Sequence, residues 1–109
     1  MAKFLACYLG SPPTGGPPSQ ETIQRGMAAW HKWMADNAGI VIDSGGPLGK
    51  TKKIGPEGVS DSRNALTGYV IIEAEDHESA ARLFLDHPHF AIFPGDSVEV
   101  MPVLPTPGS

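Results

Sequence analysis

Residues 67–88, TGYVIIEAEDHESAARLFLDHP, hold the pattern that decides the fold. Thr67–Glu75 places one Tyr, one Val and two Ile between a glycine and a charged end, which is typical of a β-strand. Asp76 follows as the N-cap of a helix, and Pro88 is expected to end that helix. Its apolar face is formed by residues at helical spacing: Ala80, Leu83, Phe84 and His87. The stretch therefore predicts a strand followed directly by a helix.

The N-terminal half predicts the same order of elements. Residues 3–9 are apolar and aromatic without a helical period, and a Gly/Pro-rich segment over 10–18 ends them. Residues 19–38 predict an amphipathic helix, and residues 39–44 a β-branched strand. The stripe of the helix is Ile23, Met27, Trp30 and Met34.

The remaining segments complete a β-α-β-β-α-β order. Residues 45–66 predict a Gly- and Pro-rich loop with a short hairpin near Ile54 and Val59, and residues 97–103 predict the last strand. With right-handed crossovers, this order gives an α+β, ferredoxin-like sandwich in which two helices cover one face of a four-stranded antiparallel sheet. We expect a single domain over 1–104 and a flexible tail over 105–109.

Composition narrows the classes of partner. The chain has 109 residues and a net charge of −4, so a nucleic-acid backbone or an anionic membrane is disfavoured as a partner. No apolar run reaches the 18 residues that a membrane span needs. The single Cys7 lies in an apolar run and is interpreted as a small buried side chain, with a reactive thiol as the alternative. We expect a cytoplasmic protein.

Both faces of the predicted sheet are apolar. On the first strand one face carries Phe4, Ala6 and Tyr8, and the other carries Leu5, Cys7 and Leu9. Because an open apolar face of this size favours aggregation, we expect a second copy to cover it in a homodimer. The alternative is that the long loops fold over that face.

Several polar residues are candidates for a site. His31 and Trp33 flank the helical stripe, where side chains can face a crevice. Carboxylates near apolar walls tend to have raised pKa values, as proton transfer requires. The alternative is that these carboxylates lie at a solvated edge of the sheet. The strand residues in this set are Asp43, Tyr69, Glu73 and Glu99.

Three other motifs are weaker indications of a functional site. Residues 45–51, GGPLGKT, resemble a phosphate-binding loop, but the spacing is one residue short and no helix can follow. His87 and His89 flank Pro88 without further ligands nearby in the sequence, so we expect no metal. The basic side chains of the long loop attract an anionic ligand or are simply solvated; they are Lys50, Lys52, Lys53 and Arg63.

Taken together, three segments resemble the YCII-related domain family over residues 3–104. They are MAAWHKWM at 27–34, DSGGPL at 43–48 and GYVIIEAED at 68–76, with His87-Pro88 and SVEV at 97–100 following. The resemblance implies a subunit of the dimeric α+β barrel superfamily, whose members include small monooxygenases and muconolactone-type isomerases or dehalogenases. One departure concerns the histidine that the better-studied branch carries in its first helix, paired with an aspartate, because the matching position here is Ala28.

We therefore expect a homodimer that binds a small organic ligand between the sheet, the first helix and the loop. If it is an enzyme, His31 or Asp43 is the expected proton acceptor in lyase, isomerase or dehalogenase-like chemistry, without a cofactor. Trp33, Tyr69, Glu73 and Glu99 are the expected ligand-binding residues. The alternatives are a non-catalytic binding or regulatory module and a cofactor-free monooxygenase.

Overall fold

The computed structural model describes residues 1–11 and 15–108, so the predicted loop over 10–19 and the predicted tail over 105–109 lie partly outside the described residues. Four strands form one antiparallel sheet in the order β2-β5-β1-β6. Their bounds are Ala2–Leu9 for β1, Val41–Pro47 for β2, Leu66–Ala74 for β5 and Ser97–Pro102 for β6. The predicted α+β class with a four-stranded antiparallel sheet is confirmed.

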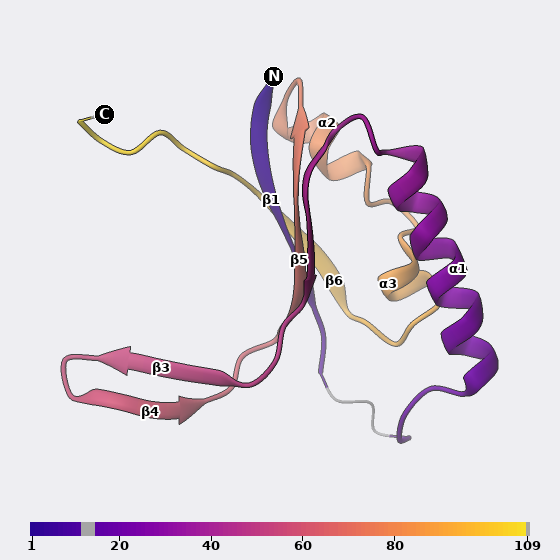
Figure 1. Cartoon of the computed structure of the whole chain (residues 1–109), viewed down its shortest axis with the longest axis horizontal. Coiled ribbons are helices and arrows are strands. Elements are labelled where there is room, and N and C mark those ends of the chain that lie inside the picture. Colours follow the sequence, from indigo (N-terminus) through magenta and orange to yellow (C-terminus); the bar gives the residue numbers. More distant parts are fainter. Residues whose placement is uncertain (12–14, 109) are drawn as a thin grey trace.

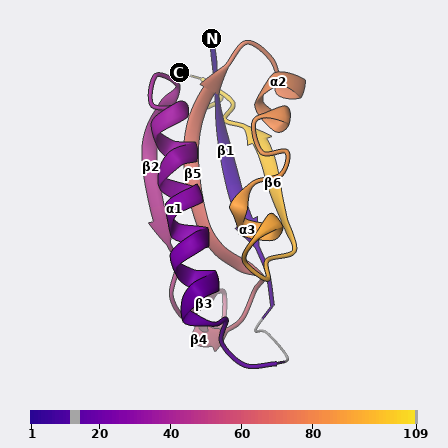
Figure 2. The ribbon, with the colours of Figure 1, turned by 90° about the vertical axis from the view of Figure 1, so that its right-hand side faces the viewer.

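Three helices cover one face of this sheet (Figure 1 and Figure 2). They are α1 (Gln20–Asp36), α2 (His77–Arg82) and α3 (Pro88–Ala91). The side chain of Ser19 begins α1 by accepting a hydrogen bond from the backbone N–H of Thr22 at 3.1 Å. The apolar stripe turns the helix toward the sheet, and Trp30, Trp33 and Met34 pack against the core.

The prediction of one continuous second helix ending at His87 is wrong. The structure has α2 ending at Arg82, a turn, and a separate α3 that Pro88 begins. Proline restricts the residue before it to extended backbone, and His87 has φ −60° and ψ 141°. Proline also suits the first helical position, where its missing N–H costs nothing. Pro88 thus starts a helix and His87 caps it.

The core lies between the sheet and the helices. The inward side chains of the strands alternate with outward ones, as predicted, and Val98 and Val100 face the helices. The fully packed members are Phe4, Ala6, Tyr8, Val70, Ile72, Ala74, Ala80 and Phe84.

The predicted hairpin in the long loop is confirmed as β3 (Thr51–Gly55) paired with β4 (Gly58–Ser62). The hairpin projects away from the sheet, on the side opposite the helices (Figure 1). Ile54 and Val59 pair across it and are 73% and 70% exposed. The hairpin is therefore an arm with apolar side chains in solvent, and it does not fold over the open face of the sheet.

Within residues 1–11 and 15–108, no helix covers that open face. On β1 it carries Leu5, Cys7 and Leu9, and Ile71 of β5 lies opposite Leu5. The chain after β6 leaves on the same side as the hairpin, with exposed Val103 and Leu104 (Figure 1). Two apolar extensions thus flank a sheet face that carries these apolar side chains together with the exposed Glu99.

Candidate functional site

A pocket of about 320 Å³ opens between the sheet and the middle of α1. One wall comes from α1 and from the segment after α3, and the other from the ends of β1, β2 and β5. The lining residues are Tyr8, Met27, Trp30, Ser44, Gly46, Pro47, Thr67, Gly68, Tyr69 and Phe93. This volume is at the lower end of the range for small-molecule sites.

No Asp, Glu, Lys, Arg or His side chain lines this pocket among the described residues. Its polar side chains are hydroxyls and one indole N–H, and the rest of the wall is apolar. An ionic group placed here would lose its hydration without gaining an ion pair, which is costly. The lining therefore favours an uncharged ligand.

The shape of the β2 wall depends on a bulge at Gly45. The pairing of β2 with β5 shifts between Asp43 and Gly46. Gly45 has φ +64°, and a Cβ at this position would lie 1.8 Å from the backbone oxygen of Tyr69. Only glycine fits both constraints.

A buried histidine lies behind the pocket. His87 is 0% exposed and is surrounded by aromatic rings. The ring-centroid distances from His87 are 4.7 Å to Trp30, 5.0 Å to Trp33, 5.1 Å to Tyr8 and 5.7 Å to Phe84. Burial, with a smaller contribution from His89, lowers the pKa of His87 to about 4. The ring is therefore neutral at pH 7.

The second histidine of the pair anchors the start of α3 to the sheet. The Nε2 of His89 donates a hydrogen bond to the backbone oxygen of Leu9 at 2.7 Å. A Cβ on Gly95 would lie 2.4 Å from the His89 ring, so the chain passes this ring closely. His89 thus holds α3 against the end of β1.

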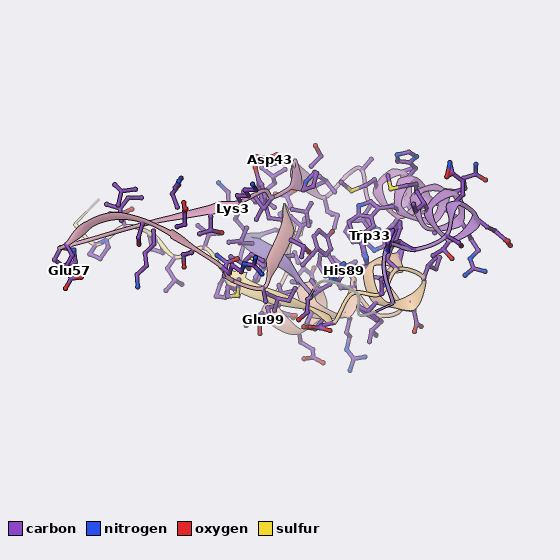
Figure 3. All side chains as sticks on the ribbon, turned by 90° about the horizontal axis from the view of Figure 1, so that it is seen from below. Lys3, Trp33, Asp43, Glu57, His89 and Glu99 are labelled. Carbon is purple, nitrogen blue, oxygen red and sulfur yellow. The ribbon has the colours of Figure 1, made fainter. Side chains whose placement is uncertain are left out.

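The two tryptophans of α1 have different surroundings. The indole Nε1 of Trp33 donates to the backbone oxygen of Leu83 at 2.9 Å, and its ring packs on Phe84. Figure 3 shows Trp33 among the helices. Trp30 instead lines the pocket and packs on Tyr8 at 4.9 Å, and its indole N–H has no hydrogen-bond partner in the described part of the chain. Trp30, rather than Trp33, is the pocket residue.

The structure does not bring the predicted proton acceptors together in this pocket. His31 is exposed on α1 and is not a lining residue. Asp43 is exposed on β2, where it pairs with Ile71 of β5, and is not a lining residue. Its Oδ1 accepts a hydrogen bond from the Gly45 N–H at 2.8 Å, so it stabilises the bulge.

The predicted ligand-binding strand residues separate as well. Tyr69 is half-buried and lines the pocket. Glu73, about 13 Å further along β5, lines a second cavity of about 310 Å³ near Asp36 and Ile40. Glu99 is exposed on the open face of the sheet, opposite Cys7 in the β1–β6 pairing (Figure 3).

The remaining candidates lie outside the pocket. Burial, with a smaller contribution from Glu99, raises the pKa of Cys7, which fits the interpretation of this thiol as a packed side chain. Lys52 pairs with Asp61 across the hairpin, and none of the four basic loop residues lines the pocket. The described residues contain no cluster of three or more His, Cys, Asp or Glu that could hold a metal. Within that same part, no helix is long and apolar enough to cross a membrane.

One solved structure extends these observations. It is the 5-chloro-2-hydroxyhydroquinone dehydrochlorinase of Burkholderia phenoliruptrix AC1100, in complex with 2,5-dihydroxybenzoquinone. The likeness has a TM-score of 0.57 at 17% sequence identity and covers 91% of this chain and 90% of the other. No family model and no curated protein matches the sequence.

At this level of identity the likeness shows a shared fold. It does not test the resemblance to YCII-related domains or the α+β barrel that this resemblance implies. Membership of that family stays a prediction, because no family model matches.

Sequence reasoning missed most of the pocket. Tyr8, Met27 and Trp30 have the periodicity of core residues, and this concealed that they also line a cavity. A usable signal was His87, which falls on the apolar face predicted for 76–87. A histidine at such a position needs partners for both ring nitrogens, and this points to a buried polar cluster.

Proposed function

We propose that this protein binds a small, uncharged aromatic compound in the pocket beside Trp30. The observation that carries the proposal is the wall itself, whose described residues combine aromatic and thioether side chains with hydroxyl groups and include no charged side chain. Pockets of this composition fix apolar rings by contact and orient them through a few polar groups. The fold that the chain shares with a hydroxyhydroquinone dehydrochlorinase makes hydroquinone a suitable first probe.

Two apolar residues on α1, Met27 and Ile23, provide a matched test of this proposal. Met27 and Ile23 lie one helical turn apart and are both 41% exposed, but only Met27 lines the pocket. We expect Met27→Glu to weaken hydroquinone binding at least about tenfold, because the wall would then carry a charge. Isothermal titration calorimetry measures the hydroquinone affinity of each variant and of the unchanged protein. Equal affinities of Met27→Glu, Ile23→Glu and the unchanged protein would show that hydroquinone binds elsewhere.

Acid/base chemistry of the dehalogenase type is the second candidate. The fold shared with a dehydrochlorinase supports it, since loss of HCl needs a proton acceptor and no redox cofactor. His31 and Asp43 stay the proposed proton acceptors, although both are exposed outside the pocket. Release of chloride from chlorohydroquinone separates this candidate from a non-catalytic binding module.

We also propose that two copies associate through their open sheet faces, giving the ferredoxin-like subunits of an α+β barrel. The open face, the hairpin and the chain after β6 all present apolar side chains on one side of the molecule (Figure 1). A second copy would remove these side chains from water, and each hairpin could reach along the other subunit.

Sedimentation tests this association. We expect a species of twice the 11.5 kDa chain mass. Leu5→Glu on the open face is expected to give the single-chain mass, because it replaces an apolar contact with a carboxylate that has no partner there. Leu85→Glu is the control, since Leu85 is 66% exposed on the other side of the sheet. A monomeric unchanged protein would contradict the association.

A further inference from the structure

The orientation of His87 follows from its hydrogen bonds. The backbone N–H of His89 donates to the Nδ1 of His87 at 3.0 Å, so Nδ1 carries no proton. His87 is buried without a carboxylate partner, and its lowered pKa keeps it neutral. A neutral imidazole has one proton, which must then be on Nε2.

This assignment determines what Tyr8 can do. The Nε2 of His87 lies 3.4 Å from the Tyr8 hydroxyl oxygen, so the protonated Nε2 donates and the hydroxyl accepts. The hydroxyl therefore keeps its own proton available for another acceptor. No side chain or backbone oxygen in the described part of the chain takes that proton, and Tyr8 lines the pocket.

The Tyr8 hydroxyl is also suited to donate rather than to act as a base. Tyr8 is 3% exposed, and burial raises its pKa above the usual range. The hydroxyl thus stays protonated in the pH range where proteins are stable. A ligand oxygen is the natural acceptor, because no carboxylate is among the described residues that line the pocket.

We propose that Tyr8 is the hydrogen-bond donor that selects an oxygen-bearing aromatic ligand in this pocket, and that His87 is the residue that positions its hydroxyl. The ligand class is an uncharged ring carrying a carbonyl or phenolic oxygen. The aromatic wall at Trp30 and Phe93 accommodates the ring, and the Tyr8 O–H meets the oxygen. This inference rests on the proposed binding function.

Three ring compounds of similar size test the selectivity: acetophenone has an oxygen acceptor, ethylbenzene has none, and benzoate is charged. We expect the protein to bind acetophenone best and benzoate worst. Tyr8→Phe is expected to weaken acetophenone binding about tenfold and to leave ethylbenzene binding unchanged. Calorimetric titration gives the ratio of the two affinities, which a general loss of packing would not change.

The role of His87 is tested by two substitutions. His87→Phe removes the donor and is expected to lower the acetophenone-to-ethylbenzene ratio by about threefold. His87→Gln is expected to restore the ratio, because its amide N–H can donate to Tyr8 while its amide oxygen accepts from the His89 N–H. In the free protein, ¹⁵N NMR of the imidazole should show the proton on Nε2, in the unchanged chain and in Tyr8→Phe.

The results distinguish failure of the proposed binding function from failure of the roles inferred for Tyr8 and His87. If the unchanged protein binds none of the three compounds, the proposed binding function and this inference both fail. If acetophenone and ethylbenzene bind but Tyr8→Phe affects them equally or not at all, the inference alone is overturned. Tighter binding of benzoate than of acetophenone, or a proton on Nδ1 of His87, would also overturn it.

Discussion

Acidification from pH 7 to pH 4 is expected to lower the free energy of unfolding by about 3 kcal/mol through His87 alone. Its pKa is about 4 in the folded protein and close to 6.5 when the chain is unfolded. Between these values the unfolded chain takes up a proton that the folded protein does not, so stability falls as the pH falls. Above pH 6.5 His87 is neutral in both the folded and the unfolded chain, so its full contribution to the free energy of unfolding is present.

Urea unfolding at pH 7, 5.5 and 4 measures this dependence. The titratable groups around the His87 ring are Tyr8, which stays protonated, and His89. His87→Gln should flatten the dependence, because glutamine does not titrate and retains hydrogen-bonding groups. His31→Gln is the control, since His31 is exposed on α1, and it should keep the full slope. An unchanged slope in His87→Gln would show that other groups cause the acid sensitivity.

Gly45→Ala is expected to destabilise the protein by about 2–5 kcal/mol. A left-handed backbone conformation costs an alanine about 1–2 kcal/mol, and overpacking typically adds another 1–3 kcal/mol. The Cβ of an alanine at this position would lie 1.8 Å from the backbone oxygen of Tyr69. That oxygen cannot move away without separating β2 from β5. The change should therefore also open the β2 wall of the pocket.

The neighbouring glycine is the matched control. A Cβ on Gly46 would meet no heavy atom within 4 Å outside its chain neighbours, although Gly46 also lines the pocket. Gly46→Ala should thus unfold close to the unchanged protein, as followed by thermal or urea denaturation. Equal stability of the two variants would contradict the role assigned to the bulge.

Much of the sheet could be predicted because it depends on local patterns. Apolar and aromatic composition over 3–9 and over 67–75 predicted the two central strands, and the stripe on 19–38 predicted α1. The break between α2 and α3 was missed because proline both ends helices and begins them. Asp86 has φ +55°, a turn conformation that its residue type permits but does not signal.

The site was harder to predict because its lining residues are mostly apolar, whereas polar residues are the usual sign of a site. His31 and Asp43 carry acid/base groups, so sequence reasoning favoured them, but both are exposed. The pocket is instead built from residues whose spacing is that of a core, such as Trp30. Whether a core residue borders a cavity depends on the packing of all the elements together, and spacing along the chain does not contain that information.

The most direct test of the account is a heteronuclear NMR titration with acetophenone that follows the two indole N–H signals of α1. We expect the Trp30 signal to shift and saturate, because Trp30 lines the pocket, while the signal of Trp33, whose N–H is bonded to Leu83, stays in place. A saturating shift at Trp33 or on the hairpin with no change at Trp30, or no saturable shift at all, would contradict it.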